Sequence, residues 1–166
     1  IETLCHSVPG TWHQMSVILS ATSCLNWVAK LLKRNAAELV AALGPELGTP
    51  SPLLFVPFLD GSWSPRSDTE IRGALIGLQH SSDEIEMARA VLQGVAFALR
   101  ECADAFRATG TSIDRLLAIG GGSRSDLWLS MLATLFGVDL RVPESSELGA
   151  AFGAARLALI AGTGAA

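Results

Sequence analysis

The sequence predicts an α/β domain, in which short strands alternate with amphipathic helices in a layered arrangement. Its 166 residues are the length of one ordinary domain, and a domain of this size removes roughly 70% of the unfolded chain's surface from water. Hydrophobic residues make up 49% of the chain, and the mean hydropathy is +0.40. This apolar excess indicates extra buried surface, such as a contact with a partner domain. No apolar run reaches the ~20 residues that a membrane span needs.

The amino-terminal segment is predicted to form a β-hairpin followed by two helices. Pro9-Gly10 is a strong turn signal between β-branched and aromatic residues, which predicts two strands. Ser20 or Thr22 is placed to cap the first helix, and Gly44-Pro45 ends the second. The expected elements are strands at Glu2–Ser7 and Trp12–Leu19, a helix through Leu32, and a helix at Asn35–Leu43.

A long helix dominates the middle of the chain. Ser81 and Glu84 form a capping-box pattern at its start, and Gly110 ends it. Gly94 lies inside this helix at a cost of about 1 kcal/mol relative to alanine, which predicts close backbone packing at that position. The segments before it are an apolar run at Leu53–Leu59, a polar loop at Asp60–Gly73 and a short strand at Ala74–Leu78.

The last third continues the alternation. Leu116–Ile119 is predicted to be a buried strand, and Gly120–Ser125 a turn into a helix at Asp126–Phe136. A final strand at Asp139–Val142 precedes Gly149–Ala161, a helix rich in alanine and suited to tight packing.

Gly120, Gly121 and Gly122 are the first candidate site. Glycines let backbone N–H groups approach an anion without an intervening Cβ, and the helix that follows offers free N–H groups and the positive end of its dipole. This pattern predicts phosphate binding, and the alternative is a plain tight turn. A P-loop is excluded because no Gly-Lys occurs. A dinucleotide fingerprint is excluded because Ser125 stands where its third glycine belongs.

The loop between Asp60 and Gly73 is the second candidate site. Asp60 and Asp68 are placed to hold hydrated Mg²⁺ indirectly, and Arg66 or Arg72 to meet phosphate. The alternative, which the residues alone favour, is ordinary turn chemistry with a surface ion pair.

Composition excludes several other functions. The net charge is −4, with no basic stripe of the kind that binds nucleic acid. Cys5, Cys24 and Cys102 are far apart, which argues against a zinc site and fits reduced thiols in a cytoplasmic protein. The three histidines are scattered and are predicted to be structural or on the surface.

A longer sequence pattern indicates the family of proteins in which these two candidate sites occur. The segment Gly73–Leu78, seven further residues and the segment Glu86–Gln93 match every fixed position of the second signature of the FGGY carbohydrate kinases. The chain therefore resembles the carboxy-terminal half of these kinases over essentially its whole length. Within the family it is most similar to the xylulose kinases, through residues 6–27, 94–99, 119–128 and 148–157.

The resemblance implies an actin-like ATPase domain, ribonuclease H-like, with a mixed sheet flanked by helices. Residues 1–166 would form the C-terminal, nucleotide-binding domain, and an N-terminal domain outside this chain would bind the sugar and supply the catalytic aspartate. No catalytic residue and no metal ligand are therefore assigned here. The implied nucleotide-binding residues are Gly120, Gly121, Gly122, Ser123, Ser125, Asp126, Thr22, Leu25 and Asn26.

The resemblance also implies ATP and Mg²⁺ as cofactors and D-xylulose as the acceptor, giving D-xylulose 5-phosphate. The expected partners are ATP or ADP and a pentulose bound mainly by the N-terminal domain, with neither nucleic acid nor membrane; a homodimer is left open. The alternatives are an FGGY kinase of glycerol, ribulose, gluconate or rhamnulose, a non-catalytic actin-like module, and an NAD-dependent dehydrogenase domain. One departure stands out: Ser62-Trp63 replaces the Glu-Arg pair of the family's polar loop.

Overall fold

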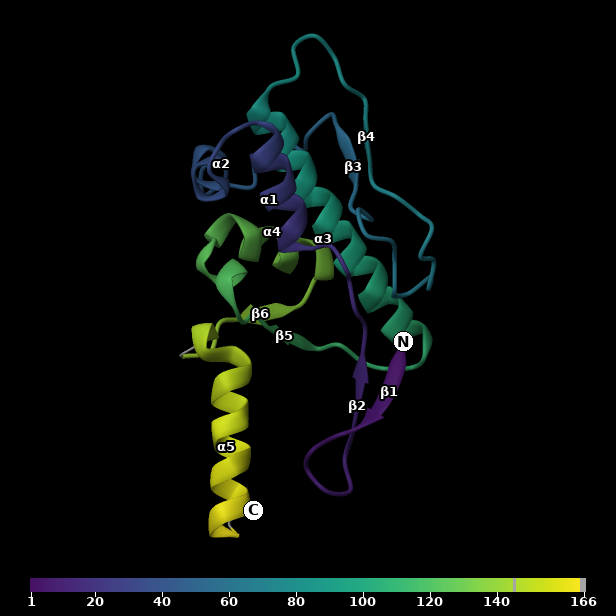
Figure 1. The fold of residues 1–166 in the computed structure, drawn as a ribbon, viewed down its shortest axis with the longest axis vertical. Helices are drawn as coiled ribbons and strands as arrows, with labels where there is room; N and C mark the ends of the chain where they lie inside the picture. Colours follow the sequence, from purple (N-terminus) through teal and green to yellow (C-terminus); the bar gives the residue numbers. More distant parts are fainter. Residues whose placement is uncertain (145, 165–166) are drawn as a thin grey trace.

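The computed structural model describes residues 1–144 and 146–164 and has the predicted order of strands and helices (Figure 1). The strands are β1 (Glu2–Cys5), β2 (Trp12–Met15), β3 (Leu54–Val56), β4 (Ala74–Ile76), β5 (Arg115–Leu117) and β6 (Asp139–Arg141). The helices are α1 (Thr22–Leu31), α2 (Ala36–Ala42), α3 (Glu84–Ala108), α4 (Asp126–Phe136) and α5 (Gly149–Thr163), with 3₁₀ helices η1 (Gly121–Arg124) and η2 (Ser146–Leu148).

Among the described residues, the strands pair in three separate two-stranded sheets. The β1–β2 hairpin and the β3–β4 pair are antiparallel, whereas β5 and β6 are parallel. In the hairpin, Glu2 lies opposite Met15 and Cys5 opposite Trp12. The β5–β6 connection runs through η1 and α4, so the glycine turn follows directly from a parallel strand, as it does in many anion sites.

The predicted caps of two helices are wrong. The N-cap of α1 is Ala21, which makes no side-chain cap bond, because the buried Ser20 hydroxyl instead donates to Asp60 Oδ2 at 3.0 Å. The N-cap of α3 is Asp83 rather than Ser81, and its carboxylate accepts from the N–H groups of Ile85 and Glu86. A carboxylate here also faces the positive end of the helix dipole, which favours it over a hydroxyl.

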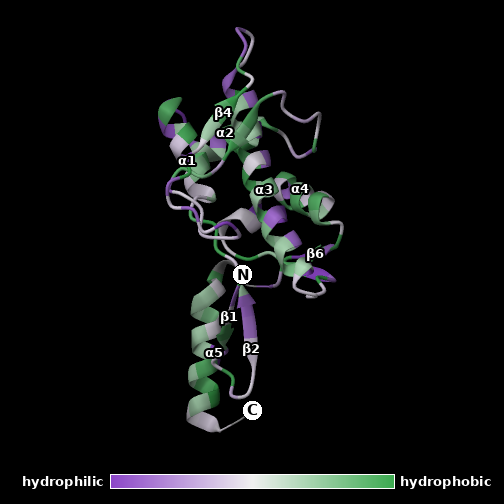
Figure 2. Cartoon of the chain, turned by 90° about the vertical axis from the view of Figure 1, so that its right-hand side faces the viewer, coloured by the Kyte–Doolittle hydropathy of each residue, from purple (hydrophilic) through white to green (hydrophobic). Residues whose placement is uncertain are grey.

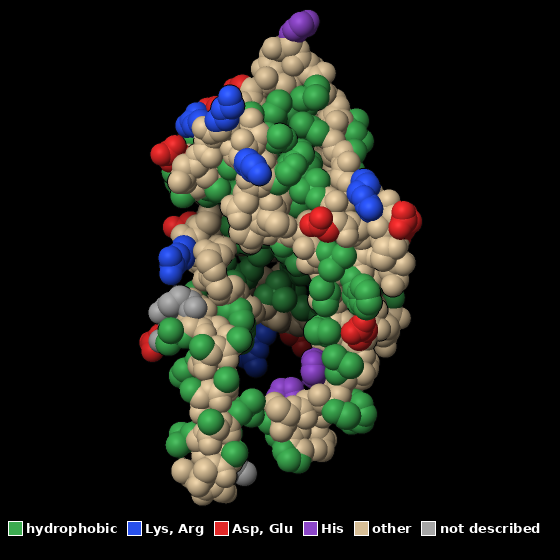
Figure 3. Space-filling model, viewed as in Figure 1, with side chains coloured by type: hydrophobic (Ala, Val, Ile, Leu, Met, Phe, Trp, Pro, Cys, Tyr) green, Lys and Arg blue, Asp and Glu red, His purple; other side chains and the backbone are tan. Residues whose placement is uncertain are grey.

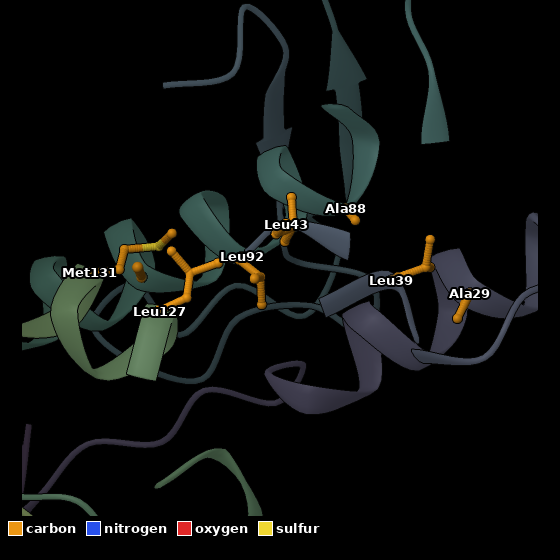
Figure 4. Packing of buried hydrophobic residues seen from close by; sticks show 8 residues of the cluster. Ala29, Leu39, Leu43, Ala88, Leu92, Leu127 and Met131 are labelled. Atoms are coloured by element: carbon orange, nitrogen blue, oxygen red, sulfur yellow. The ribbon is translucent and has the colours of Figure 1, made fainter. Parts of the chain in front are cut away.

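Helix α3 is the central helix of the fold, because β3, α1, α2 and α4 all pack against it. The close packing predicted at Gly94 is confirmed, and its partner is the backbone of β3: an added Cβ would lie 2.2 Å from the carbonyl oxygen of Phe55. One hydrophobic cluster joins α3 to α2 and α4 (Figure 4), and a second joins it to α1 and β3. Trp128 and Leu25 pack against both clusters, so they connect the two halves of the core.

Helix α5 differs from the rest because it projects from the body of the fold (Figure 1). Residues 150–163 are all exposed, and Arg156 is the one charged residue in the helix. The hydropathy colouring in Figure 2 and the green side chains in Figure 3 show how apolar its surface is. The tight packing expected for this helix is therefore not made within the described chain. None of the described helices combines the length and hydrophobicity needed to cross a bilayer.

Candidate functional site

A pocket with a volume of about 670 Å³ lies between α1, α2 and the start of α4. Its size falls within the roughly 300–1,000 Å³ that is typical of small-molecule sites. Side chains of α3 also reach it, so that it adjoins the hydrophobic core. Its lining consists of Ala21, Thr22, Leu25, Asn26, Ala36, Ala37, Val40, Ala41, Gly44, Pro45, Leu92, Val95, Gly121, Gly122, Arg124, Ser125, Asp126, Leu127 and Trp128.

The glycine turn forms one end of this pocket. Gly120 has φ 82° and ψ −171°, a backbone conformation that is essentially restricted to glycine. Gly121 and Gly122 then begin η1, so a 3₁₀ turn stands between the glycines and α4, where the sequence predicted a direct turn into the helix. As the first residues of η1, Gly121 and Gly122 have N–H groups with no acceptor inside that helix.

Gly120 and Ser123 brace the turn but do not line the pocket. The Ser123 hydroxyl donates to the Gly120 carbonyl oxygen at 2.7 Å and lies 3.3 Å from the Ser146 hydroxyl of η2. The Gly120 N–H donates to the Ser146 carbonyl oxygen at 3.1 Å. These contacts hold the two pocket-facing glycines in place.

The amino-terminal end of α4 meets the same pocket. Ser125 is its N-cap, and the Ser125 hydroxyl accepts from the Trp128 N–H at 3.3 Å. Asp126 is the first residue of the helix. The starts of η1 and α4 therefore present to the pocket the positive ends of their dipoles and first-turn N–H groups, of which those of Gly121 and Gly122 have no partner among the described residues. This is an environment that stabilises a bound anion.

The Trp128 side chain packs against the glycine turn at Gly122. A Cβ at Gly122 would lie 3.3 Å from Trp128 Cδ1 and Nε1, tighter than an ordinary van der Waals contact. Gly121 has no such neighbour, and its missing side chain faces open space. The second and third glycines therefore differ: Gly122 makes room for the indole ring, whereas nothing lies within 4 Å of an added Cβ at Gly121.

The other walls come from α1 and α2. Thr22, Leu25 and Asn26 line the pocket from the first turns of α1, next to the glycine turn. The facing wall was missed by sequence reasoning and consists of small apolar side chains of α2 and the Gly44-Pro45 turn. The Asn35 side chain fixes the start of α2 by accepting from the N–H groups of Ala37 and Glu38. The only signal in the sequence is the row of small residues on α2: Ala36, Ala37, Val40 and Ala41.

The second candidate site does not join the pocket. The Asp68 carboxylate accepts from the N–H groups of Glu70 and Ile71, which is an Asx turn, and Arg72 donates to nearby backbone carbonyls. Arg66 pairs with Glu101 of α3, with 2.7 Å between Nη2 and Oε1. The loop is thus organised by turn chemistry and a surface ion pair. Within residues 1–144 and 146–164, no group of three or more His, Cys, Asp and Glu is arranged to hold a metal.

The cysteines lie apart from the pocket and are unpaired. Burial, with a smaller effect from the Asp60 carboxylate, raises the pKa of the Cys24 thiol to about 11. The Cys24 thiol donates to the carbonyl oxygens of Ser20 and Pro57. Burial also raises the pKa of Cys102, whereas Cys5 is exposed.

Known proteins of similar sequence agree with the resemblance that the sequence suggested. The profile of the C-terminal domain of the FGGY family of carbohydrate kinases matches residues 2–162. The xylulose kinase of Escherichia coli K12 is 41% identical over 162 residues, which are 97% of this chain and 34% of that protein. The chain therefore spans about a third of the length of such relatives.

Solved structures show the same likeness. A xyloylose (xylulose) kinase from Brucella ovis superposes with a TM-score of 0.92 at 48% identity, over 99% of this chain and 34% of the other. The xylulose kinase of Rhodospirillum rubrum superposes with a TM-score of 0.77 at 28% identity, over the same shares of the two chains. The fold is the actin-like ATPase fold of these kinases, as expected. The chain belongs to the FGGY family of carbohydrate kinases, whose C-terminal domain it matches.

Proposed function

We propose that this chain is the ATP-binding part of a sugar kinase that transfers the γ-phosphate of ATP to D-xylulose, giving D-xylulose 5-phosphate. The observation that carries the proposal is the pocket, which combines the glycine turn and the start of α4 at one end with an apolar wall from α2 at the other. The relatives that cover nearly all of this chain carry the name xylulose kinase, which supports the choice of sugar.

The pocket offers complementary surfaces to the two ends of a nucleotide. The phosphates would lie against Gly121, Gly122 and the start of α4, where backbone N–H groups meet negative charge. The adenine would lie between Leu25 of α1 and the small side chains of α2, with Thr22 and Asn26 at the border of its site. Asp126 would lie near the adenosine.

Phosphoryl transfer depends mainly on positioning and charge neutralisation, and this chain supplies the positioning. Mg²⁺ is usually held by substrate phosphates and water rather than by a dedicated protein cage, so it would be held by the bound ATP and would neutralise phosphate charge. An N-terminal domain outside this chain would bind the pentulose and supply the aspartate that accepts the hydroxyl proton. Closure of the two domains would exclude water from the reaction.

The proposed function also includes a cellular location and an oligomeric state. The three free cysteines support a reducing, cytoplasmic location. A homodimer stays a prediction, to be checked by sedimentation of the protein. Nucleic-acid binding is not expected, because the net charge is −4.

Isothermal titration calorimetry of this chain with ATP tests the proposal. We expect weak but saturable ATP binding, no competition from NADH, and no release of ADP when D-xylulose is added. Tight NADH binding would favour a dehydrogenase domain, and failure to bind ATP would refute the nucleotide site. Xylulose-dependent ADP release by this chain would contradict the assignment of the sugar site to another domain.

The acceptor needs a separate assay, because this chain spans only about a third of its relatives. The chain joined to its N-terminal domain is to be assayed with D-xylulose, ribulose, glycerol, gluconate and rhamnulose. The highest kcat/KM is expected with D-xylulose. Preference for another acceptor would identify a different FGGY kinase, and nucleotide binding without any transfer would identify a non-catalytic module.

A further inference from the structure

Arg124 is a cationic side chain of the pocket that has no partner among the described residues. It is the last residue of η1, two positions after Gly122, and it lines the pocket together with Gly121, Gly122 and Ser125. Among the described residues no hydrogen bond or ion pair is formed by its guanidinium. It was not among the site residues that the sequence suggested.

The other arginines show that this is unusual for the chain. Arginines with carboxylate or carbonyl partners are Arg34, Arg66, Arg72, Arg89, Arg100, Arg107 and Arg141. The guanidinium of Arg156 lies over the Phe152 ring at 5.9 Å. Only Arg115 shares with Arg124 the lack of a partner in the described chain, and Arg115 lies in β5 and does not line the pocket.

The charged residues that line the pocket also set Arg124 apart from the other arginines. Arg124 and Asp126 are its only two charged lining residues, and they are not paired with each other in the described chain. A guanidinium has five N–H donors in a planar fork that matches phosphate oxygens two at a time. Beside it, η1 and α4 present N–H groups that favour an anion but carry no net charge.

We propose that Arg124 binds a phosphate group of the nucleotide and makes the pocket select nucleoside polyphosphates over nucleosides. This inference rests on the proposed nucleotide site and adds a residue and a selectivity to it. The backbone N–H groups would fix where the phosphates lie, and Arg124 would supply the neutralising charge. Because η1 also contains Gly121 and Gly122, the backbone N–H groups and the guanidinium belong to one short segment. Their positions relative to each other are therefore fixed by that segment.

The test compares Arg124→Ala and Arg124→Lys with the matched control Arg115→Ala, which removes the other unpaired arginine without touching the pocket. Affinities for ATP, ADP and adenosine are measured by calorimetry at two salt concentrations, after circular dichroism shows that each variant is folded. Arg124→Ala is expected to weaken ATP and ADP binding roughly 10- to 100-fold, the usual range for a hydrogen bond to a charged group. Adenosine binding is expected to stay within about twofold in every variant. Arg124→Lys is expected to fall between the wild type and Arg124→Ala, because an ammonium keeps the charge but loses the planar fork.

Three results would overturn the inference. An equal loss of adenosine binding in Arg124→Ala would mean that the side chain contacts the base or ribose. An equal loss of ATP binding in Arg115→Ala would mean that general charge, rather than a contact, sets the affinity. Unchanged ATP binding in Arg124→Ala would remove any role for this residue while leaving the proposed function intact. If the wild type itself binds no ATP, both the proposed function and this inference fail.

Discussion

The carbonyl oxygen of Phe55 in β3 lies 2.2 Å from the point where a Cβ of residue 94 would be, so Gly94 of α3 rests directly on the backbone of that strand. Backbone atoms move less easily than the ends of flexible side chains. The contact therefore requires glycine at this position, although glycine costs about 1 kcal/mol inside a helix.

Gly94→Ala is expected to destabilise the protein by about 1–3 kcal/mol or more, the range for overpacking a tight contact. The matched control is Gly153→Ala in α5, where nothing lies within 4 Å of the added Cβ. That change is expected to leave stability unchanged or raise it. Urea unfolding followed by circular dichroism measures both, and a Gly94→Ala protein as stable as Gly153→Ala would disprove the contact.

Replacing Gly120 and replacing Gly121 are expected to have different effects. Gly120→Ala should lower stability by about 1–3 kcal/mol, because its positive φ is strained for a residue with a Cβ. Gly121→Ala should leave stability unchanged and weaken ATP binding, because nothing lies within 4 Å of the added Cβ and Gly121 lines the pocket. Chemical unfolding and ATP titration of each variant separate the two effects, and equal stabilities would contradict the strain at Gly120.

Filling the α2 side of the pocket is expected to block the nucleotide. Ala41→Trp places a large ring in the wall that faces the glycine turn and should reduce ATP affinity on the order of tenfold or more, which corresponds to about 1.4 kcal/mol or more. Ala42→Trp, one residue further on the same helix, is exposed and does not line the pocket. Similar ATP affinities for the two variants would show that the base lies elsewhere.

The thiols are expected to differ in reactivity. At pH 8, Cys24, with its pKa raised to about 11, is almost entirely protonated and buried, and Cys102 is also buried with a raised pKa. A water-soluble disulfide reagent should therefore modify Cys5 alone in the native protein and all three thiols after unfolding. Rapid modification of more than one thiol in the native protein would contradict this burial.

Stability is expected to fall as the pH rises from about 9 to about 11. In this window the unfolded Cys24 thiol, with its ordinary pKa of 9.0, loses its proton while the folded thiol keeps it, because its pKa is about 11. The unfolded state then binds fewer protons, so the free energy of unfolding decreases with pH. Unfolding curves of the wild type and Cys24→Ala test this, and an equally steep decline in both would assign it to other groups.

The sequence predicted the elements of this fold well because hydrophobic periodicity and turn residues are local signals. α4 was predicted at its observed bounds, and the helix containing Gly94 was predicted with its packing constraint. The cap of α1 was wrong because a tertiary contact decided it: Ser20 is held by Asp60, which is 40 residues away. The cap of α3 was wrong because a neighbouring carboxylate, Asp83, takes that position in place of Ser81.

The candidate site was predicted only in part, for a related physical reason. The glycine turn and the first turns of α1 carry recognisable residue patterns. The wall from α2 consists of ordinary small residues, and it faces the pocket only because α2 docks on α3 through the hydrophobic core around Leu39 and Leu92. The role proposed for Arg124 could not be predicted from the sequence, because its lack of a partner among the described residues is a property of the folded chain.

Ser146 gives the projecting helix α5 a mechanical connection to the glycine turn. Its carbonyl and hydroxyl contact Gly120 and Ser123, and η2 continues directly into α5. The exposed helix is therefore connected, through Ser146, to the glycine-turn end of the pocket. A contact that tilts α5 about Ser146 would act on the turn through these two hydrogen bonds, next to Gly121 and Gly122.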